Sequence, residues 1–212
     1  MMKPRITEYL EKEILRIIDE AISVLDTRDL ARENIIKISR DLIRCSGRVV
    51  SLLLAEERYK AENELRSCET LARELLKHLN EAPDLVRGLG SQALAEYCEA
   101  LLLSKIFIET TLECDDNIPK ESVLSGILDL TGELKRIAIR LLGEWDLEKV
   151  REIIDLMKKI YLKLSPLDYP DALVPGYRHK IDVLRRNIED LETLYVDVKT
   201  RRELINRLSE SS

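Results

Sequence analysis

The chain has few of the residues that build turns, sheets and disulfide scaffolds. Its 212 residues include 7 glycines, 6 prolines and 4 cysteines, and aromatic residues make up only 4%. Glycine and proline together reach about half of the usual share of roughly 12%, which argues against a turn-rich sandwich or barrel and favours long helices. General disorder is also excluded, because 45% of the residues are hydrophobic. We therefore expect one all-α domain over residues 1–212.

Motifs of several functional classes are absent. We expect buried thiols rather than a zinc site, because no C-x-x-C pair occurs among the four cysteines, Cys45, Cys68, Cys98 and Cys114. Neither histidine has a serine or cysteine partner at a recognisable spacing, so a histidine-based nucleophilic mechanism is not indicated. A glycine-rich phosphate loop is absent as well.

The sequence also gives no sign of a membrane protein. No hydrophobic run approaches the ~20 residues of a membrane span, and the N-terminal segment is too charged for a signal peptide. We expect no membrane partner and a cytoplasmic location. The net charge of −6 argues against a protein that covers duplex nucleic acid through general positive charge, although a local basic surface is compatible with it.

The positions of the helix breakers predict about seven helices, packed as an antiparallel bundle. A first helix should run from Pro4 to about Leu25, with Asp26 as the N-cap of the second. We expect a turn within residues 56–64, a break over 83–90 with Ser91 as the next N-cap, and a helix over 92–112. Further helices should cover residues 119–143, 146–164 and 177–207, with a frayed tail after them.

Apolar stripes at helical spacing support these assignments. The helix after Pro119 carries a stripe that predicts a facing helix, formed by Val123, Ile127, Leu130, Leu134, Ile137 and Leu141. Gly132 is unusual inside this helix, where glycine costs about 1 kcal/mol relative to alanine. We interpret it as a point where another helix or a ligand approaches closely.

Two pairs of acids share helical faces because their members are three or four residues apart, Glu96 with Glu99 and Asp129 with Glu133. Each pair alone is common in a helical protein with 35% charged residues. The second pair could form an exposed ion-pair ladder with Arg136 and Arg140, worth ~0.2–0.5 kcal/mol per pair. Together, however, two helices with two carboxylates each could close an all-oxygen site for Mg²⁺ or Mn²⁺. Such a site can hydrolyse phosphodiesters.

A basic stripe lies on one face of the predicted second helix and consists of Lys37, Arg40, Arg44 and Arg48. Nearby Glu33 and Asp41 offset part of its charge. An anionic partner such as a nucleic-acid backbone would relieve the remaining repulsion. The alternative is that the stripe pairs with acids of its own or a neighbouring helix. Base-specific readout is not expected, because aromatic residues that could stack on bases are scarce.

Four segments of the chain form a recognisable set: KISRDL at 37–42, LAEYCEA at 94–100, GILDLTGELKR at 126–136 and YRHKIDVLRRNIEDLETLYVDVKTR at 177–201. They resemble the translin family, and in particular its Trax (translin-associated factor X) branch. The resemblance extends from about residue 33 to 201 in the family's order, and DLTGEL is its most specific string.

This resemblance implies a seven-helix fold and a homo-octamer around a hollow interior. It also implies a Mg²⁺-dependent endoribonuclease, of a stand-alone prokaryotic type, that cuts single-stranded or loosely paired RNA inside the shell. The family's catalytic acids fall on Glu96, Glu99, Asp129 and Glu133. Translin itself lacks the full set, so the presence of all four favours the Trax side.

The resulting hypothesis assigns Mg²⁺ most directly to Glu99 and Glu133, while Glu96 and Asp129 complete the metal site or position the attacking water. RNA would be held by the basic stripe. Two alternatives remain open at this stage: a non-catalytic shell that binds RNA or single-stranded DNA, and a helical scaffold whose acids pair with Arg136 and Arg140.

Overall fold

The computed structural model describes residues 5–81, 84, 88–108, 110–111 and 113–210. These residues contain no strand and form six long helices: α1 (Arg5–Leu54), α2 (Arg58–Glu81), α4 (Leu89–Phe107), α5 (Lys120–Gly143), α6 (Leu147–Leu164) and α7 (Tyr177–Glu210). The all-α prediction is confirmed, with a helix count close to the seven expected. No described helix has an apolar window suited to crossing a lipid bilayer.

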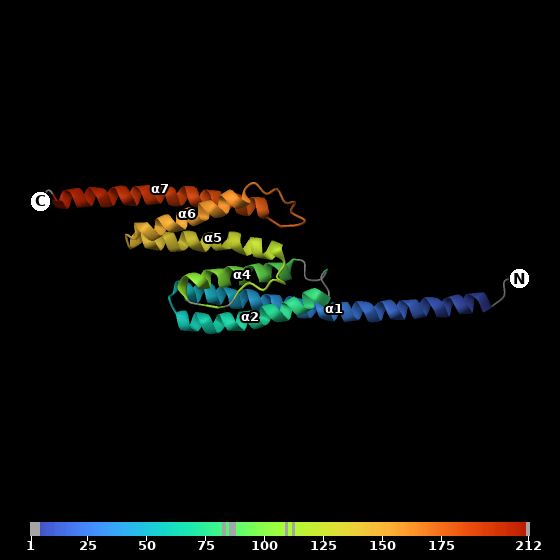
Figure 1. Cartoon of the computed structure of the whole chain (residues 1–212). Coiled ribbons are helices and arrows are strands. Elements are labelled where there is room, and N and C mark those ends of the chain that lie inside the picture. Colours follow the sequence, from blue (N-terminus) through green and yellow to red (C-terminus); the bar gives the residue numbers. More distant parts are fainter. Residues whose placement is uncertain (1–4, 82–83, 85–87, 109, 112, 211–212) are drawn as a thin grey trace.

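The helices form two groups that meet along α4 and α5 (Figure 1). In one group α4 packs against α1 and α2, and in the other α5 packs against α6 and α7. The N-terminal half of α1 and the C-terminal part of α7 extend beyond the body in opposite directions (Figure 1). Any site built from α4 and α5 therefore lies where the two groups join.

Neighbouring helices differ in their relative direction. The pairs α1–α2 and α6–α7 run antiparallel, as expected for a bundle. In contrast, α4 and α5 run parallel, because the chain between them returns along the length of α4 before α5 begins (Figure 1). The α5–α7 pair is parallel as well, since Asp129 contacts Lys180 while Lys135 contacts Asp190 farther along both helices. Parallel alignment brings corresponding levels of α4 and α5 together.

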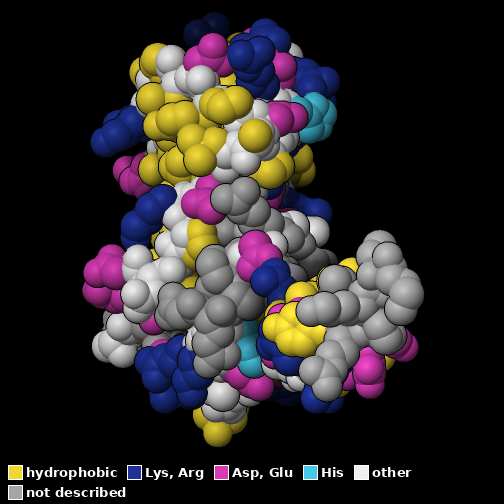
Figure 2. Space-filling model, turned by 90° about the vertical axis from the view of Figure 1, so that its right-hand side faces the viewer, with side chains coloured by type: hydrophobic (Ala, Val, Ile, Leu, Met, Phe, Trp, Pro, Cys, Tyr) yellow, Lys and Arg dark blue, Asp and Glu magenta, His cyan; other side chains and the backbone are white. Residues whose placement is uncertain are grey.

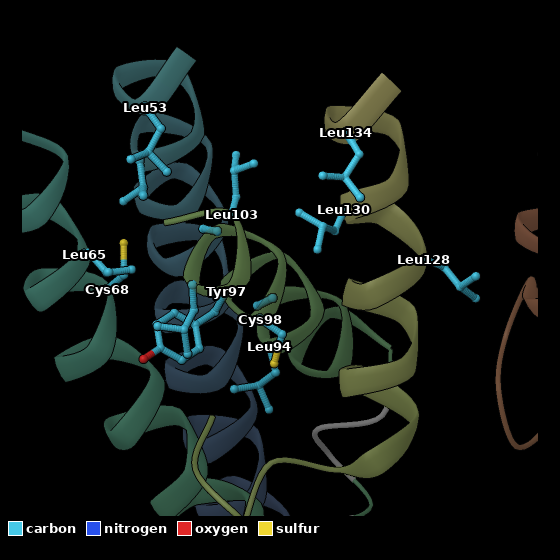
Figure 3. Packing of buried hydrophobic residues seen from close by; sticks show 14 of the residues in the cluster. Leu53, Leu65, Cys68, Leu94, Tyr97, Cys98, Leu103, Leu128, Leu130 and Leu134 are labelled. Atoms are coloured by element: carbon cyan, nitrogen blue, oxygen red, sulfur yellow. The ribbon is translucent and has the colours of Figure 1, made fainter. Parts of the chain in front are cut away.

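The core lies between the helices of both groups. In Figure 3, Leu130 and Leu134 of α5 point toward α4 and α1, whereas Leu128 points away from them. All three side chains are buried. The apolar stripe predicted for this helix therefore does face another helix. Because α5 also contacts α6 and α7, it buries side chains on more than that one face.

Local sequence signals located several helix ends correctly. Pro119 precedes α5, which ends at Gly143, and the Asp146 side chain caps α6 by accepting a hydrogen bond from the Lys149 amide at 3.2 Å. The turn after α1 falls at residues 55–57, at the start of the predicted range, with Glu56 at a φ of 60°. α7 begins at Tyr177 as predicted and continues through Glu210.

The predicted break at residue 26 and both predicted ends of α4 were wrong. α1 is continuous through residue 26, where a break was expected, because neither glycine nor proline interrupts it there and local pairs satisfy its polar side chains. Thr27 Oγ1 donates to the Ser23 carbonyl at 2.9 Å, and Arg32 pairs with Asp29 at 3.0 Å. α4 starts at Leu89 with Gly88 as its N-cap, not Ser91, and it ends at Phe107. The predicted break rested on Pro83, Gly88 and Gly90; Pro83 lies outside the described residues, and Gly90 lies within α4.

The expectation of buried thiols holds fully only for Cys98, because Cys114 is free but half-buried and the other two cysteines are oxidised. Cys45 of α1 and Cys68 of α2 form a disulfide, with Cα atoms 5.7 Å apart, whereas Cys98 and Cys114 are free. Sequence spacing does not predict this bond, because the alignment of α1 against α2 decides which cysteines meet. The bond ties the two helices that support α4.

Candidate functional site

The two acid-bearing helices touch at Gly126. A Cβ atom placed there would lie 2.5 Å from the Ala95 carbonyl oxygen and 2.9 Å from the Cβ of Cys98, so only glycine permits this approach. No other helix of the described chain approaches Gly132, whose position is exposed and open, so that part of its interpretation was wrong, while the approach of a ligand there stays a prediction. The two sequence segments that carry the acids are therefore in direct backbone contact.

All four predicted acids are half-buried and belong to one electrostatic cluster. Burial raises the pKa of Glu99 to about 8, and the nearby carboxylates of Glu96, Asp129 and Glu133 act in the same direction. The pKa of Glu96 is also raised, first by burial and then by Asp129. The structure thus brings together the carboxylates that the spacing had placed on two separate faces.

Lys180 of α7 supplies a cation to this cluster. Its Nζ donates to Asp129 Oδ2 at 2.5 Å and to Ser125 Oγ at 2.6 Å. Its charge partly offsets the rise in the pKa of Glu96 and Glu99. Reasoning from the sequence missed Lys180 as a site residue, because it lies about 50 positions beyond Asp129 and only the packing of α7 on α5 brings it in. The one signal in the sequence was its place in the 177–201 segment.

Glu133 keeps one oxygen without a hydrogen bond. Its buried Oε2 accepts none in the described structure, although Arg136 Nη1 lies 3.2 Å away as an ion pair. Arg140 turns away from the cluster and contacts the Leu54 carbonyl and Glu56. Of the predicted ion-pair ladder, only the pair between Glu133 and Arg136 is present, and Glu133 Oε2 still accepts no hydrogen bond.

The donor set suits a hard divalent cation in its chemistry, since four carboxylates provide only oxygen ligands. A buried carboxylate oxygen without a hydrogen bond and a strongly raised glutamate pKa are the features that a bound cation would relieve. In the side-chain arrangement described, however, no three acidic, cysteine or histidine residues converge as a metal site would require. Asp129 is engaged by Lys180 instead.

The basic stripe lies on the exposed face of α1, away from the core side formed by Leu42, Cys45 and Val49. Arg44 pairs with Asp41 at 2.7 Å, and Arg48 pairs with Glu64 of α2. Lys37 and Arg40 are exposed and form no ion pair within the described part of the chain. Half of the stripe is thus neutralised locally, and Lys37 and Arg40 remain accessible to an external anion.

Comparison with known proteins then identifies the family. The profile of the translin family matches residues 93–202, which include both acid pairs and Lys180. This chain belongs to the translin family. The match covers about half of the chain. It includes most of α4, all of α5 and α6, and most of α7.

Solved structures and a sequence relative extend the similarity over most of the chain. The crystal structure of AfC3PO is 32% identical with a TM-score of 0.78, covering 87% of this chain and 98% of AfC3PO. AfC3PO in a complex with duplex RNA is equally similar, with coverage of 87% and 97%. Apo-NeC3PO, at 20% identity and a TM-score of 0.69, shares the fold over 93% and 99% of the two chains. An uncharacterised protein of Methanocaldococcus jannaschii, MJ0175, is 27% identical over 194 residues, covering 86% of this chain and 85% of the relative.

Proposed function

We propose that this translin-family protein is a metal-dependent endoribonuclease of the Trax type. The observation that carries the proposal is the clustering of four carboxylates at the α4–α5 contact, with the pKa of Glu99 raised to about 8 by burial and by its acidic neighbours. Such a concentration of half-buried acids is costly to stability when they ionise and is typical of a functional site. A ladder of exposed ion pairs on one helix would not require α4 and α5 to approach each other so closely at Gly126.

Within this site, Glu99 and Glu133 are assigned to hold the cation, because Glu99 is strongly perturbed and Glu133 has an oxygen without a hydrogen bond. Glu96 and Asp129 complete the site or orient the attacking water. Mg²⁺, or Mn²⁺ in its place, would supply activated water and neutralise charge that develops on the phosphate. Asp129 becomes accessible to the site when it separates from Lys180.

RNA is the proposed substrate. AfC3PO, which is similar over most of the chain, forms a complex with duplex RNA. We extend this to single-stranded or loosely paired RNA, with single-stranded DNA as a possible ligand, and assign backbone contacts to the basic stripe, Lys37, Arg40, Arg44 and Arg48. A Lys37→Ala, Arg40→Ala variant should bind all sequences more weakly. A plot of the logarithm of the binding constant against the logarithm of the salt concentration should become less steep in the variant. The slope should change by about 0.7–0.9 for each phosphate that the variant no longer neutralises. An unchanged slope would remove these residues from the assignment.

A homo-octamer is the assembly we propose. The projecting half of α1 exposes many large hydrophobic side chains, among them Leu10, Ile14, Ile18 and Leu25, which are between 46% and 63% exposed. Figure 2 shows the end from which α1 projects, and hydrophobic side chains also gather over its upper part. Exposed apolar surface of this extent marks an association surface. Mass measurement by light scattering would test the subunit number.

The decisive experiment is a cleavage assay with end-labelled single-stranded and duplex RNA in Mg²⁺, Mn²⁺ or EDTA. The test variant is Glu99→Ala, Glu133→Ala, and the matched control is Glu74→Ala, at an exposed position of α2. We expect wild type and control to cut RNA only with the metal. The double variant should lose at least about 100-fold in rate while a gel shift shows retained RNA binding. Equal cutting by wild type and double variant would refute the assignment.

A second candidate function is RNA binding without catalysis. The observation that favours it is the Lys180–Asp129 ion pair, which neutralises part of the cluster without any metal. This alternative predicts that RNA is retained but intact, that binding is insensitive to EDTA, and that affinity falls steeply with salt. A protein that neither cuts nor shifts RNA would instead be a helical scaffold.

A further inference from the structure

Two free cysteines lie side by side at the α4–α5 contact. Cys98 belongs to α4 and Cys114 to the connection that leads into α5, and their sulfur atoms are 3.4 Å apart without a covalent bond. The Cβ of Cys98 is also one of the atoms nearest to Gly126 of α5. Cys98 therefore lies between the connection and the helix that follows it.

The two thiols differ in accessibility. Cys98 is fully buried, whereas Cys114 is half-buried and lines a cavity of about 350 Å³ together with Tyr97 and Arg73. A small reagent can enter this cavity and reach Cys114, while Cys98 is reachable only through its neighbour. This arrangement separates an attacking thiol from a resolving thiol.

The acidity of Cys114 agrees with this order of attack. Its hydrogen bond with Cys98 lowers the pKa of Cys114 to about 7, and the positive charges of Lys105 and Lys120 also lower it. Near neutral pH a large share of Cys114 is therefore thiolate, which is the nucleophilic form.

We propose that Cys98 and Cys114 form a second, reversible disulfide by exchange with a small-molecule disulfide such as oxidised glutathione. The Cys114 thiolate attacks one sulfur of that disulfide, and the other sulfur leaves as a thiolate. Cys98 then attacks the Cys114 sulfur, gives its proton to the departing thiolate and releases the second small thiol. The protein loses two electrons, and these reduce the small disulfide to two thiols.

The bond would tie the connection into α5 onto α4 beside the acid cluster. It spans a separation of 16 residues, and closing a loop of this size in the unfolded chain should raise the Tm by roughly 6–12 °C. The inference is independent of the proposed nuclease activity, because it requires neither metal nor RNA.

The first test is a peptide map of the full-length protein. Reduced protein is incubated with oxidised glutathione, alkylated under denaturing conditions and digested with trypsin without reduction. Cys98 and Cys114 then fall on separate peptides, 88–105 and 106–120, and neither contains Cys45 or Cys68. We expect these two peptides to be cross-linked and the link to disappear after reduction. A stable glutathione adduct on Cys114, or alkylation of both thiols, would overturn the proposal.

The matched control is Cys114→Ser, which alters a partly exposed position and leaves Cys45 and Cys68 free to form their disulfide. Oxidation should raise the Tm of wild type above that of the variant by roughly 6–12 °C. In the variant, Cys98 should remain unreactive toward glutathione in the folded protein. The same Tm response in both proteins would show that no bond between Cys98 and Cys114 contributes.

Discussion

Replacing Glu99 by glutamine should stabilise the protein while removing its proposed function. A glutamate with a folded-state pKa of about 8, against an ordinary 4.5, binds its proton more tightly in the folded than in the unfolded state. Below about pH 4.5 both states keep the proton, and the carboxyl costs nothing. As the pH rises toward 8, the free energy of unfolding falls by about 1.4 kcal/mol per pH unit, and above 8 the loss is constant.

The full loss would be about 5 kcal/mol, and partial contact of this half-buried carboxyl with water reduces it to about 2–4 kcal/mol. Glutamine has nearly the same shape and no charge. The Glu99→Gln variant should therefore melt roughly 4–16 °C above wild type at pH 9 in EDTA, and the two should converge near pH 4.5. RNA cleavage by the variant should be lost over the whole pH range.

The assay is thermal unfolding at fixed protein concentration between pH 4.5 and 9, with Glu74→Gln as an exposed control. The control should follow wild type at every pH. A Tm difference between Glu99→Gln and wild type that does not change with pH would refute the reasoning, and so would a variant less stable than wild type at pH 9. Added Mg²⁺ should raise the Tm of wild type more than that of the variant.

Further predictions concern the contacts around the acid cluster. Gly126→Ala should lower the free energy of unfolding by about 1–3 kcal/mol, because the added Cβ would overlap α4. Gly132→Ala, in open space, should be neutral or raise it by up to about 1 kcal/mol. Urea unfolding measures both changes. Lys180→Gln should increase the Tm gain caused by Mg²⁺, while Lys135→Gln, which removes another α5–α7 ion pair, should not. Cys45→Ala should lower the Tm by roughly 6–12 °C through loss of the disulfide, and a change below about 2 °C would contradict this.

Much of the fold follows from local sequence signals. The scarcity of glycine and proline predicted an all-α chain, and Pro119, Gly143 and Asp146 marked helix ends within a residue or so because capping and chain breaking act over one turn. The predicted break at Asp26 failed for the complementary reason. Aspartate is favoured at a cap but is tolerated inside a helix where it is exposed, as Asp26 is, because water solvates its carboxylate.

The candidate site was predictable in part. Spacing alone put Glu96 with Glu99, and Asp129 with Glu133, on two faces, because residues three or four apart on a helix share a side. Spacing left open whether these two faces meet, and only the structure places the four acids together around Glu99. Their roles in metal binding and catalysis, and that of the basic stripe, remain predictions.

The sequence by itself determined which segments are helical and which side chains share a helical face, since both depend on contacts within a few residues. Tertiary structure alone decided that α4 and α5 run parallel and touch at Gly126, that Lys180 reaches Asp129, and that Cys45 meets Cys68. These features depend on how one helix aligns against another along its length. That alignment is set by side-chain packing summed over whole helix faces, and no short motif encodes it.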